Sequence, residues 1–174
     1  MNAIRIPNNI NERIANAVDF FWKTRSGQIS KQNSFGMRDQ GNRGAVTGGK
    51  QLDGFVELIF DLLVLNGVPE RCIYTNSNLE LPGYYRPNKK WDLLVVDGGE
   101  LIIAIEFKSQ VGPSFGNNFN NRTEEAMGSA LDLWTAYREG IFGKQNAPWL
   151  GYFMVLEEDR KSTRLNSSHS QISY

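Results

Sequence analysis

The chain has few of the side chains that form covalent or metal cross-links, with one cysteine and one histidine among its 174 residues. The single thiol, Cys72, can neither close a disulfide within the chain nor build a zinc site, so we expect a reducing, cytoplasmic environment. No apolar run approaches the length of a membrane span, and the N-terminus, MNAIRIPNN, lacks the apolar segment of a signal peptide. Disulfide-stapled, zinc-binding and membrane-spanning classes are therefore not indicated.

The chain also lacks an excess of charge, because 19 Lys and Arg residues balance 19 Asp and Glu residues. No overall basic field points to nucleic acid, although an enzyme can concentrate positive charge in one cleft. Hydrophobic residues make up 40% and charged residues 22%, which is typical of a soluble globular domain. The length suits one ordinary domain.

The last sixteen residues, 159–174 (DRKSTRLNSSHSQISY), differ from the rest in composition. They resemble the in-frame translation of a sequencing-library adapter, and the plainer alternative is a Ser/Asn-rich polar tail. We therefore expect a single domain over 1–158, a non-native disordered tail over 159–174, and a natural protein that continues beyond Glu158. The tail holds the only histidine, His169, so residues 1–158 offer no imidazole base or ligand.

Apolar periodicity predicts an α/β fold. The predicted helices cover residues 10–25, 50–66 and 123–139, and the predicted strands cover 71–75, 91–96, 101–108 and 149–156; loops are predicted over 26–49, 76–90 and 112–122. From the second helix onward the order is helix, strand, strand, strand, helix, strand. The last helix links two strands by a crossover, which favours a parallel pair there. The pattern therefore predicts a mixed sheet flanked by helices.

Two carboxylates and a lysine on neighbouring predicted strands form the strongest chemical pattern. Glu106 and Lys108 are two residues apart on one strand, so their side chains point to the same face, and apolar residues surround them. A buried carboxylate and ammonium are costly unless they serve each other or a ligand. Together with Asp92 on the preceding strand they provide the hard oxygen ligands that Mg²⁺ prefers and a cation beside it. This inventory suits phosphodiester cleavage.

The hairpin between these strands must have a particular register for the site to form. A two-residue turn at Gly98-Gly99 pairs Asp97 with Glu100, and a regular ladder would then place Asp92 on the face opposite Glu106. A three-residue turn, or a bulge, brings Asp92 level with Glu106. We predict one of these two irregularities. The alternative is structural: Asp92 caps a strand, and Glu106 and Lys108 form an ion pair on a half-exposed face.

The element order and the Asp92…Glu106-Phe107-Lys108 pattern resemble the PD-(D/E)xK nuclease core. More specifically, Ala104–Gly140 (AIEFKSQVGPSFGNNFNNRTEEAMGSALDLWTAYREG) and Arg43–Phe55 (RGAVTGGKQLDGF) resemble XhoI-type restriction endonucleases. The likeness covers most of residues 20–158, and the one departure is Trp91 where the broader superfamily often has proline.

This resemblance implies Mg²⁺-dependent cleavage of double-stranded DNA at the palindrome CTCGAG by a homodimer. It also implies that Asp92 and Glu106 bind the metal, that the Phe107 carbonyl is a possible third ligand, and that Lys108 is the catalytic base or an electrostatic stabiliser. Glu57, on the preceding helix, is a further carboxylate that related nucleases bring to the site. A solvated helix face explains Glu57 equally well, because it lies off the apolar stripe.

The segment from Gln110 to Arg122 and the Gly-rich loop before residue 50 are the predicted DNA-binding regions. Asn and Gln can bond adenine edges, Arg can bond guanine or phosphate, and Gly-rich backbone can hold phosphates. The candidates are Gln110, Ser114, Asn117, Asn118, Asn120, Asn121, Arg122, Arg38 and Arg43. Asn121 could equally be only a helix cap.

Two other functions use the same residues. One is a repair or recombination nuclease with this core and no sequence preference. The other is a DNA-binding or structural domain in which the carboxylates are merely paired.

Overall fold

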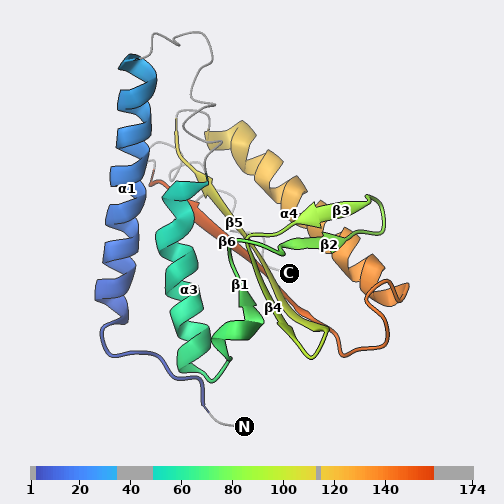
Figure 1. The fold of residues 1–174 in the computed structure, drawn as a ribbon. Helices are drawn as coiled ribbons and strands as arrows, with labels where there is room; N and C mark the ends of the chain where they lie inside the picture. Colours follow the sequence, from blue (N-terminus) through green and yellow to red (C-terminus); the bar gives the residue numbers. More distant parts are fainter. Residues whose placement is uncertain (1–2, 35–48, 113–114, 159–174) are drawn as a thin grey trace, which may run out of the picture. The chain divides into compact units, whose positions relative to one another are not determined.

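A computed structural model describes residues 3–34, 49–112 and 115–158, and the chain divides into two compact units, Met1–Thr75 and Asn76–Tyr174 (Figure 1). The first unit contains α1 (Ile10–Ser34), the 3₁₀ turn η2 (Lys50–Leu52), α3 (Asp53–Leu65), the 3₁₀ turn η3 (Glu70–Cys72) and β1 (Ile73–Tyr74). The second contains β2 (Glu80–Pro82), β3 (Asn88–Lys90), β4 (Leu93–Asp97), β5 (Glu100–Gln110), α4 (Phe115–Arg138) and β6 (Trp149–Leu156). Among the described helices, none combines the length and apolarity that a bilayer crossing requires.

In the first unit, α1 packs against α3 through small and aromatic side chains. A Cβ on Gly54 would lie 3.3 Å from the Cα of Ala17, so glycine permits this close approach. The rings of Phe21 and Phe55, both almost fully buried, meet edge to face with centroids 6.5 Å apart. An ion pair between Arg13 and Asp61 also joins the two helices. Gly54 and Phe55 therefore lie on the face of the predicted second helix that packs against α1.

Two boundaries in the first unit differ from the prediction. α1 continues nine residues beyond the predicted end at Arg25, to Ser34. The added stretch is polar but contains no proline, and a helix can continue through polar residues that its pattern does not reveal. The strand predicted over 71–75 is reduced to β1, because the chain first makes the turn η3.

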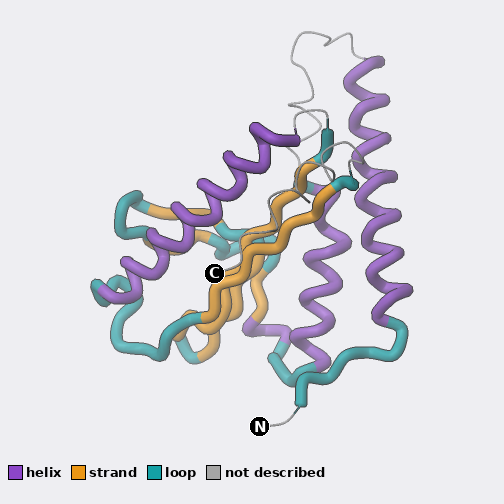
Figure 2. The backbone as a smooth tube through the Cα atoms, turned by 180° about the vertical axis from the view of Figure 1, so that it is seen from behind, coloured by secondary structure: helices purple, strands orange, loops and turns teal. Residues whose placement is uncertain are grey.

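The second unit is built on a mixed sheet in which β4 pairs antiparallel with β5, and β5 pairs parallel with β6. α4 connects β5 to β6 and packs along the sheet, with Leu133 and Ala136 among its buried residues (Figure 2). Leu93, Ala104 and Phe107 are among the buried residues of the sheet. The predicted α/β class, element order and parallel crossover pair are confirmed.

The hairpin of β2 and β3 lies where the sequence predicted only a loop. Its register pairs Glu80 with Lys90 and Pro82 with Asn88. Both strands are three residues long, and both are too short and too polar to show an alternating pattern (ELP and NKK). This hairpin, which the sequence did not predict, contributes one residue to the candidate site.

α4 begins at Phe115, eight residues before the predicted start at Thr123. The predicted loop over 112–122 is therefore wrong for most of its length, and the alternative that Asn121 caps the helix is wrong as well. The Thr123 hydroxyl donates to the Phe119 carbonyl at 3.0 Å, a bond made inside a helix. The Asn-rich run misled the prediction because asparagine favours turns in the absence of tertiary contacts.

Candidate active site

The β4–β5 hairpin decides which side chains share a face. Its turn has two residues, Gly98 and Gly99, with φ values of 58° and 87°, and it pairs Asp97 with Glu100. Positive φ at both positions is the signature of a type I′ turn, which glycine adopts without strain. The three-residue turn considered from the sequence is therefore not formed.

A bulge corrects the register that this turn would impose. Val96 pairs with Leu101, whereas Val95 pairs with Ile103, so Ile102 is an extra residue on β5. Leu93 then pairs with Ile105, which places Asp92, one residue before, level with Glu106. The predicted irregularity is confirmed as a bulge, and without it the two carboxylates would lie on opposite faces of the sheet.

Asp92 is held by the backbone of the neighbouring strand. Its N–H donates to the Ile105 carbonyl at 3.2 Å, and its Oδ2 accepts the Phe107 N–H at 2.7 Å. The preceding residue, Trp91, is 2% exposed and anchors this end of β4 in the core. Backbone contacts on both sides therefore fix the Asp92 carboxylate beside β5.

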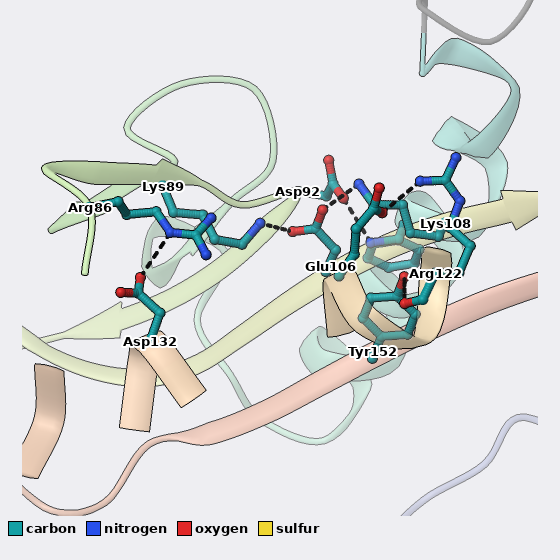
Figure 3. Close-up of polar contacts among 10 residues, drawn as sticks. Arg86, Lys89, Asp92, Glu106, Lys108, Arg122, Asp132 and Tyr152 are labelled. Carbon is teal, nitrogen blue, oxygen red and sulfur yellow. Dashed lines mark hydrogen bonds and ion pairs between the residues drawn. The ribbon is translucent and has the colours of Figure 1, made fainter. Parts of the chain in front are cut away.

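Glu106 is the most buried acid of the site, and each of its oxygens has a lysine partner. The residue is 5% exposed. Its Oε1 pairs with the Lys108 ammonium, as the spacing of two predicted, and its Oε2 lies 2.7 Å from Nζ of Lys89. Figure 3 shows the two lysines approaching Glu106 from opposite sides. A buried carboxylate with two ammonium partners is fully compensated.

Sequence reasoning missed Lys89, which comes from β3. Its side chain is 12% exposed, and its Nζ also lies 4.7 Å from the centroid of the Trp91 ring. The only signal in the sequence was its position three residues before Asp92. That signal has no meaning until the β2–β3 hairpin is known, because an isolated lysine in a polar stretch is ordinarily solvated.

Burial has the largest effect on the pKa of the Asp92 carboxyl. Removal from water raises the pKa of its carboxyl above the usual value, and the negative charge of Glu106 raises it further. The Phe107 N–H and the charges of Lys108 and Lys89 act in the opposite direction but do not cancel the effect of burial. A divalent cation beside this carboxyl would favour the charged form instead.

Tyr152 and Arg122 border the site on the side of β6 and α4. Tyr152 pairs with Glu106 in the parallel register, and its hydroxyl donates to the Arg122 carbonyl at 3.1 Å. Burial, followed by the negative charge of Glu125, raises the pKa of Tyr152 to about 12. The guanidinium of Arg122 pairs with Glu125 at 2.6 Å, while its buried Nε has no hydrogen-bond partner among the described residues. Tyr152 therefore links Arg122 on α4 to the strand that lies beside Glu106.

The other predicted residues are placed as follows. Glu57 is exposed on α3 in the first unit. Gln110 is buried at the end of β5, Asn117 and Asn118 lie in the first turn of α4, and Asn120 and Asn121 are exposed on that helix. Ser114, Arg38 and Arg43 lie outside the described residues. The DNA-binding roles of this set stay predictions.

The donor set contains two carboxylates and no third acidic, histidine or cysteine ligand. Within the described ranges, no group of three or more such side chains is close enough to hold a metal ion. The Phe107 carbonyl offers a further oxygen on the same edge, because the N–H and C=O of alternate residues on a strand point the same way and the Ile105 carbonyl meets Asp92. Two carboxylates plus one carbonyl, completed by waters, fit the way proteins hold Mg²⁺.

A mixed α/β unit whose central hairpin gathers Asp92, Glu106 and Lys108 has the architecture of a restriction-endonuclease-like core. The family comparison agrees. The family model described as restriction endonuclease XhoI matches residues 31–173, and the chain belongs to this family.

Curated relatives have the same designation. The chain is 54% identical over 132 residues to the type II restriction enzyme BstVI of Geobacillus stearothermophilus, covering 73% of this chain and 59% of that protein. It is 49% identical over 151 residues to AbrI of Azospirillum brasilense, covering 86% and 68%. It is 51% identical over 146 residues to XhoI of Xanthomonas vasicola, covering 83% and 58%. The chain thus spans about three fifths to two thirds of these relatives, and no solved structure matches it.

Proposed function

We propose that this chain carries the cleavage centre of a Mg²⁺-dependent type II restriction endonuclease that acts on double-stranded DNA. The observation that carries the proposal is the bulge at Ile102, which puts Asp92 level with Glu106 and Lys108. A sheet built only for stability would gain nothing from two buried carboxylates on one face, because bringing like charges together in a low dielectric is costly.

Asp92, Glu106 and the Phe107 carbonyl are the proposed ligands of the cation. A bound Mg²⁺ supplies positive charge for the phosphate and makes a water acidic enough to act as the nucleophile. The residues of the chain orient these ligands: the Phe107 N–H holds one oxygen of Asp92, and the interior of the sheet excludes water from Glu106. Glu57 stays a candidate for a further carboxylate.

Lys108 is the proposed base or electrostatic stabiliser. Its ammonium already contacts Glu106 and is 28% exposed, so it can face a phosphate while still touching the ligand. A cation in this position stabilises negative charge that develops on the attacking oxygen and on the phosphate. No histidine can take this role within residues 1–158, because that range contains none.

The relatives support the specific form of the proposal. Three proteins designated type II restriction enzymes share about half of the aligned residues, and one of them is XhoI. We propose CTCGAG as the site, a homodimer as the form that matches its two-fold symmetry, and the cytoplasm as the compartment. Asn117, Asn118, Asn120, Asn121 and Arg122 on α4, with Gln110, Ser114, Arg38 and Arg43, are the proposed DNA contacts.

A plasmid with one CTCGAG sequence tests the proposal. Incubation with Mg²⁺ should give one linear product, and Lys108→Ala should reduce cleavage at least ~10³-fold while DNA binding persists. Lys144→Ala, an exposed lysine far along the same unit, is the matched control and should cut normally. A smear of products would support the non-specific nuclease, and intact plasmid would support a DNA-binding domain. Full cleavage by Lys108→Ala would overturn the assigned role.

A further inference from the structure

Lys89 occupies the oxygen of Glu106 that a cation would need. Its Nζ lies 2.7 Å from Oε2, while Lys108 takes Oε1, so both oxygens of this 7%-exposed side chain are engaged by ammonium groups. Each ammonium occupies one lone-pair direction of the oxygen that it contacts, and it repels a cation that approaches the other lone pair of the same oxygen. Binding of a cation by Glu106 is therefore more favourable once one lysine has moved.

The charges of the cluster balance in the absence of a cation. Asp92 and Glu106 carry two negative charges, and Lys89 and Lys108 carry two positive ones. A dication that enters beside four compensated charges meets repulsion from both ammonium groups. Removal of one lysine leaves a site with net negative charge, which attracts a dication more strongly.

Lys89 is the lysine that can move without losing all its partners. Its Nζ lies over the Trp91 ring at 4.7 Å, so an aromatic face remains available when Glu106 turns to another partner. Lys108, in contrast, follows Glu106 on the same strand and has no other ion pair among the described residues. The competition for Oε2 is therefore between the cation and Lys89.

The hairpin that carries Lys89 is anchored independently of Glu106. At its tip, Oδ1 of Asp132 on α4 accepts the N–H groups of Tyr84 at 3.0 Å and Tyr85 at 2.7 Å. Oδ2 of Asp132 pairs with Nε of Arg86 at 3.3 Å, and the Asp132 side chain is 4% exposed (Figure 3). A Cβ on Gly83 would lie 2.5 Å from the same oxygen, so the tip fits closely around this carboxylate. Lys89 is thereby kept near the site in either state.

We propose that Lys89 is a positioning residue that holds Glu106 in place of the cation, and that a divalent cation competes with it for Oε2 and displaces it on binding. The proposal rests on the proposed function, since it assumes that Asp92 and Glu106 bind a divalent cation. It assigns to the β2–β3 hairpin a role in the site that neither the family pattern nor the sequence spacing includes.

Calcium titration tests this assignment without relying on cleavage. Isothermal titration of the purified protein with CaCl₂ should show that Lys89→Met binds Ca²⁺ roughly three- to tenfold more tightly than the unaltered protein, because one repelling charge and one competitor are gone. Lys89→Arg keeps the charge and should bind like the unaltered protein. Lys90→Met is the matched control, because this neighbour on β3 is exposed, and it should change nothing.

The outcomes separate the two proposals. Unchanged or weaker Ca²⁺ binding by Lys89→Met overturns the role of Lys89, because a merely structural lysine would leave the ligands less ordered on removal. A thermal melt of Lys89→Met confirms that the variant is folded during the titration, and Lys89→Arg binding Ca²⁺ as tightly as Lys89→Met would also overturn the role. No Ca²⁺ binding by the unaltered protein, matching Asp92→Ala, overturns the cation site itself. Tight binding without plasmid cleavage overturns only the endonuclease.

Discussion

Burial of Asp92 makes this residue unfavourable for stability at neutral pH. Its pKa is raised above the ordinary value of 3.8, chiefly by removal from water, so the folded state holds the carboxyl proton more tightly than the unfolded state does. The stabilisation that comes from this tighter proton binding is fully present below the pKa that Asp92 has in the unfolded state. It is lost as the pH rises through the pKa that Asp92 has in the folded state. Above that range the charged carboxylate is tolerated at a cost, which suggests a functional reason to keep it.

Asp92→Asn should therefore stabilise the protein while it removes activity. The amide oxygen can still accept the Phe107 N–H, but the buried charge is gone. We expect the free energy of unfolding at pH 7.5 to rise by about 0.5–1 kcal/mol, a figure already reduced for partial solvent exposure. Urea unfolding at pH 7.5 and pH 4.5 measures this gain, which should shrink at the lower pH. Glu139→Gln, an exposed acid, is the control, and an equal gain there would refute the burial argument.

At the scale of the elements, the bulge in β5 and the anchor on α4 each position one part of the site. The bulge sets the side of the sheet on which Asp92 lies, and the anchor sets the place of the β2–β3 hairpin. Neither feature supplies a proposed catalytic group, so each can be altered without removing one.

Deletion of Ile102 should leave the metal site in place, because the residues that remain pair in the same register. With the extra residue gone, the two-residue turn continues into a regular ladder in which Val95 still pairs with Ile103, and Asp92 stays level with Glu106. Ile102→Ala keeps the bulge, and because Ile102 is 41% exposed we expect little change in activity or in the melting temperature. Calcium titration and circular dichroism of both variants measure site and fold separately. A folded deletion variant that no longer binds Ca²⁺ would contradict the register argument.

Asp132→Ala should loosen the β2–β3 hairpin. Loss of the Asp132 carboxylate leaves the Tyr84 and Tyr85 amides without their acceptor and Arg86 without its ion pair. We expect about 2–3 kcal/mol of destabilisation, since a buried charged acceptor is removed from three donors. Chemical denaturation gives the value, and Glu124→Ala, an exposed position on the same helix, is the comparison. A loss no greater than that of Glu124→Ala would show that the anchor contributes nothing.

At the scale of the whole molecule, the balance of charge provides no overall basic field for the proposed binding of DNA. Lys and Arg equal Asp and Glu in number over the chain. The four charged groups of the site also balance, so under the proposed function a bound dication would supply the excess positive charge that faces a phosphate.

Metal removal should therefore weaken DNA binding as well as stop cleavage. We expect affinity for a CTCGAG duplex to fall at least ~10-fold when Ca²⁺ is replaced by EDTA, because two positive charges beside the phosphate are lost. Fluorescence anisotropy with a labelled duplex measures this, and a scrambled duplex is the control for sequence preference. Light scattering of the complex should give two protein chains per duplex if the homodimer is correct. Equal affinity with EDTA and Ca²⁺ would exclude a bound cation at the phosphate.

The sequence by itself determined the candidate residues of the site and the main elements. Asp92, Glu106 and Lys108 could be chosen because charged residues within apolar strands are rare, and the spacing of two places Glu106 and Lys108 on one face. The crossover helix and the parallel β5–β6 pair followed from element order. The pattern also required an irregular hairpin, since a regular one would have separated the carboxylates.

Only the tertiary structure decided where the irregularity lies and which other residues join the site. Placing the extra residue at Ile102 depends on how the whole of β5 packs, and either a longer turn or a bulge satisfied the sequence. The roles of Lys89 and Asp132 could not be predicted, because their partners lie 17 and about 48 residues away along the chain. Periodicity reports whether a residue is buried, but the partner of a buried charge is set by long-range packing, which local patterns do not contain.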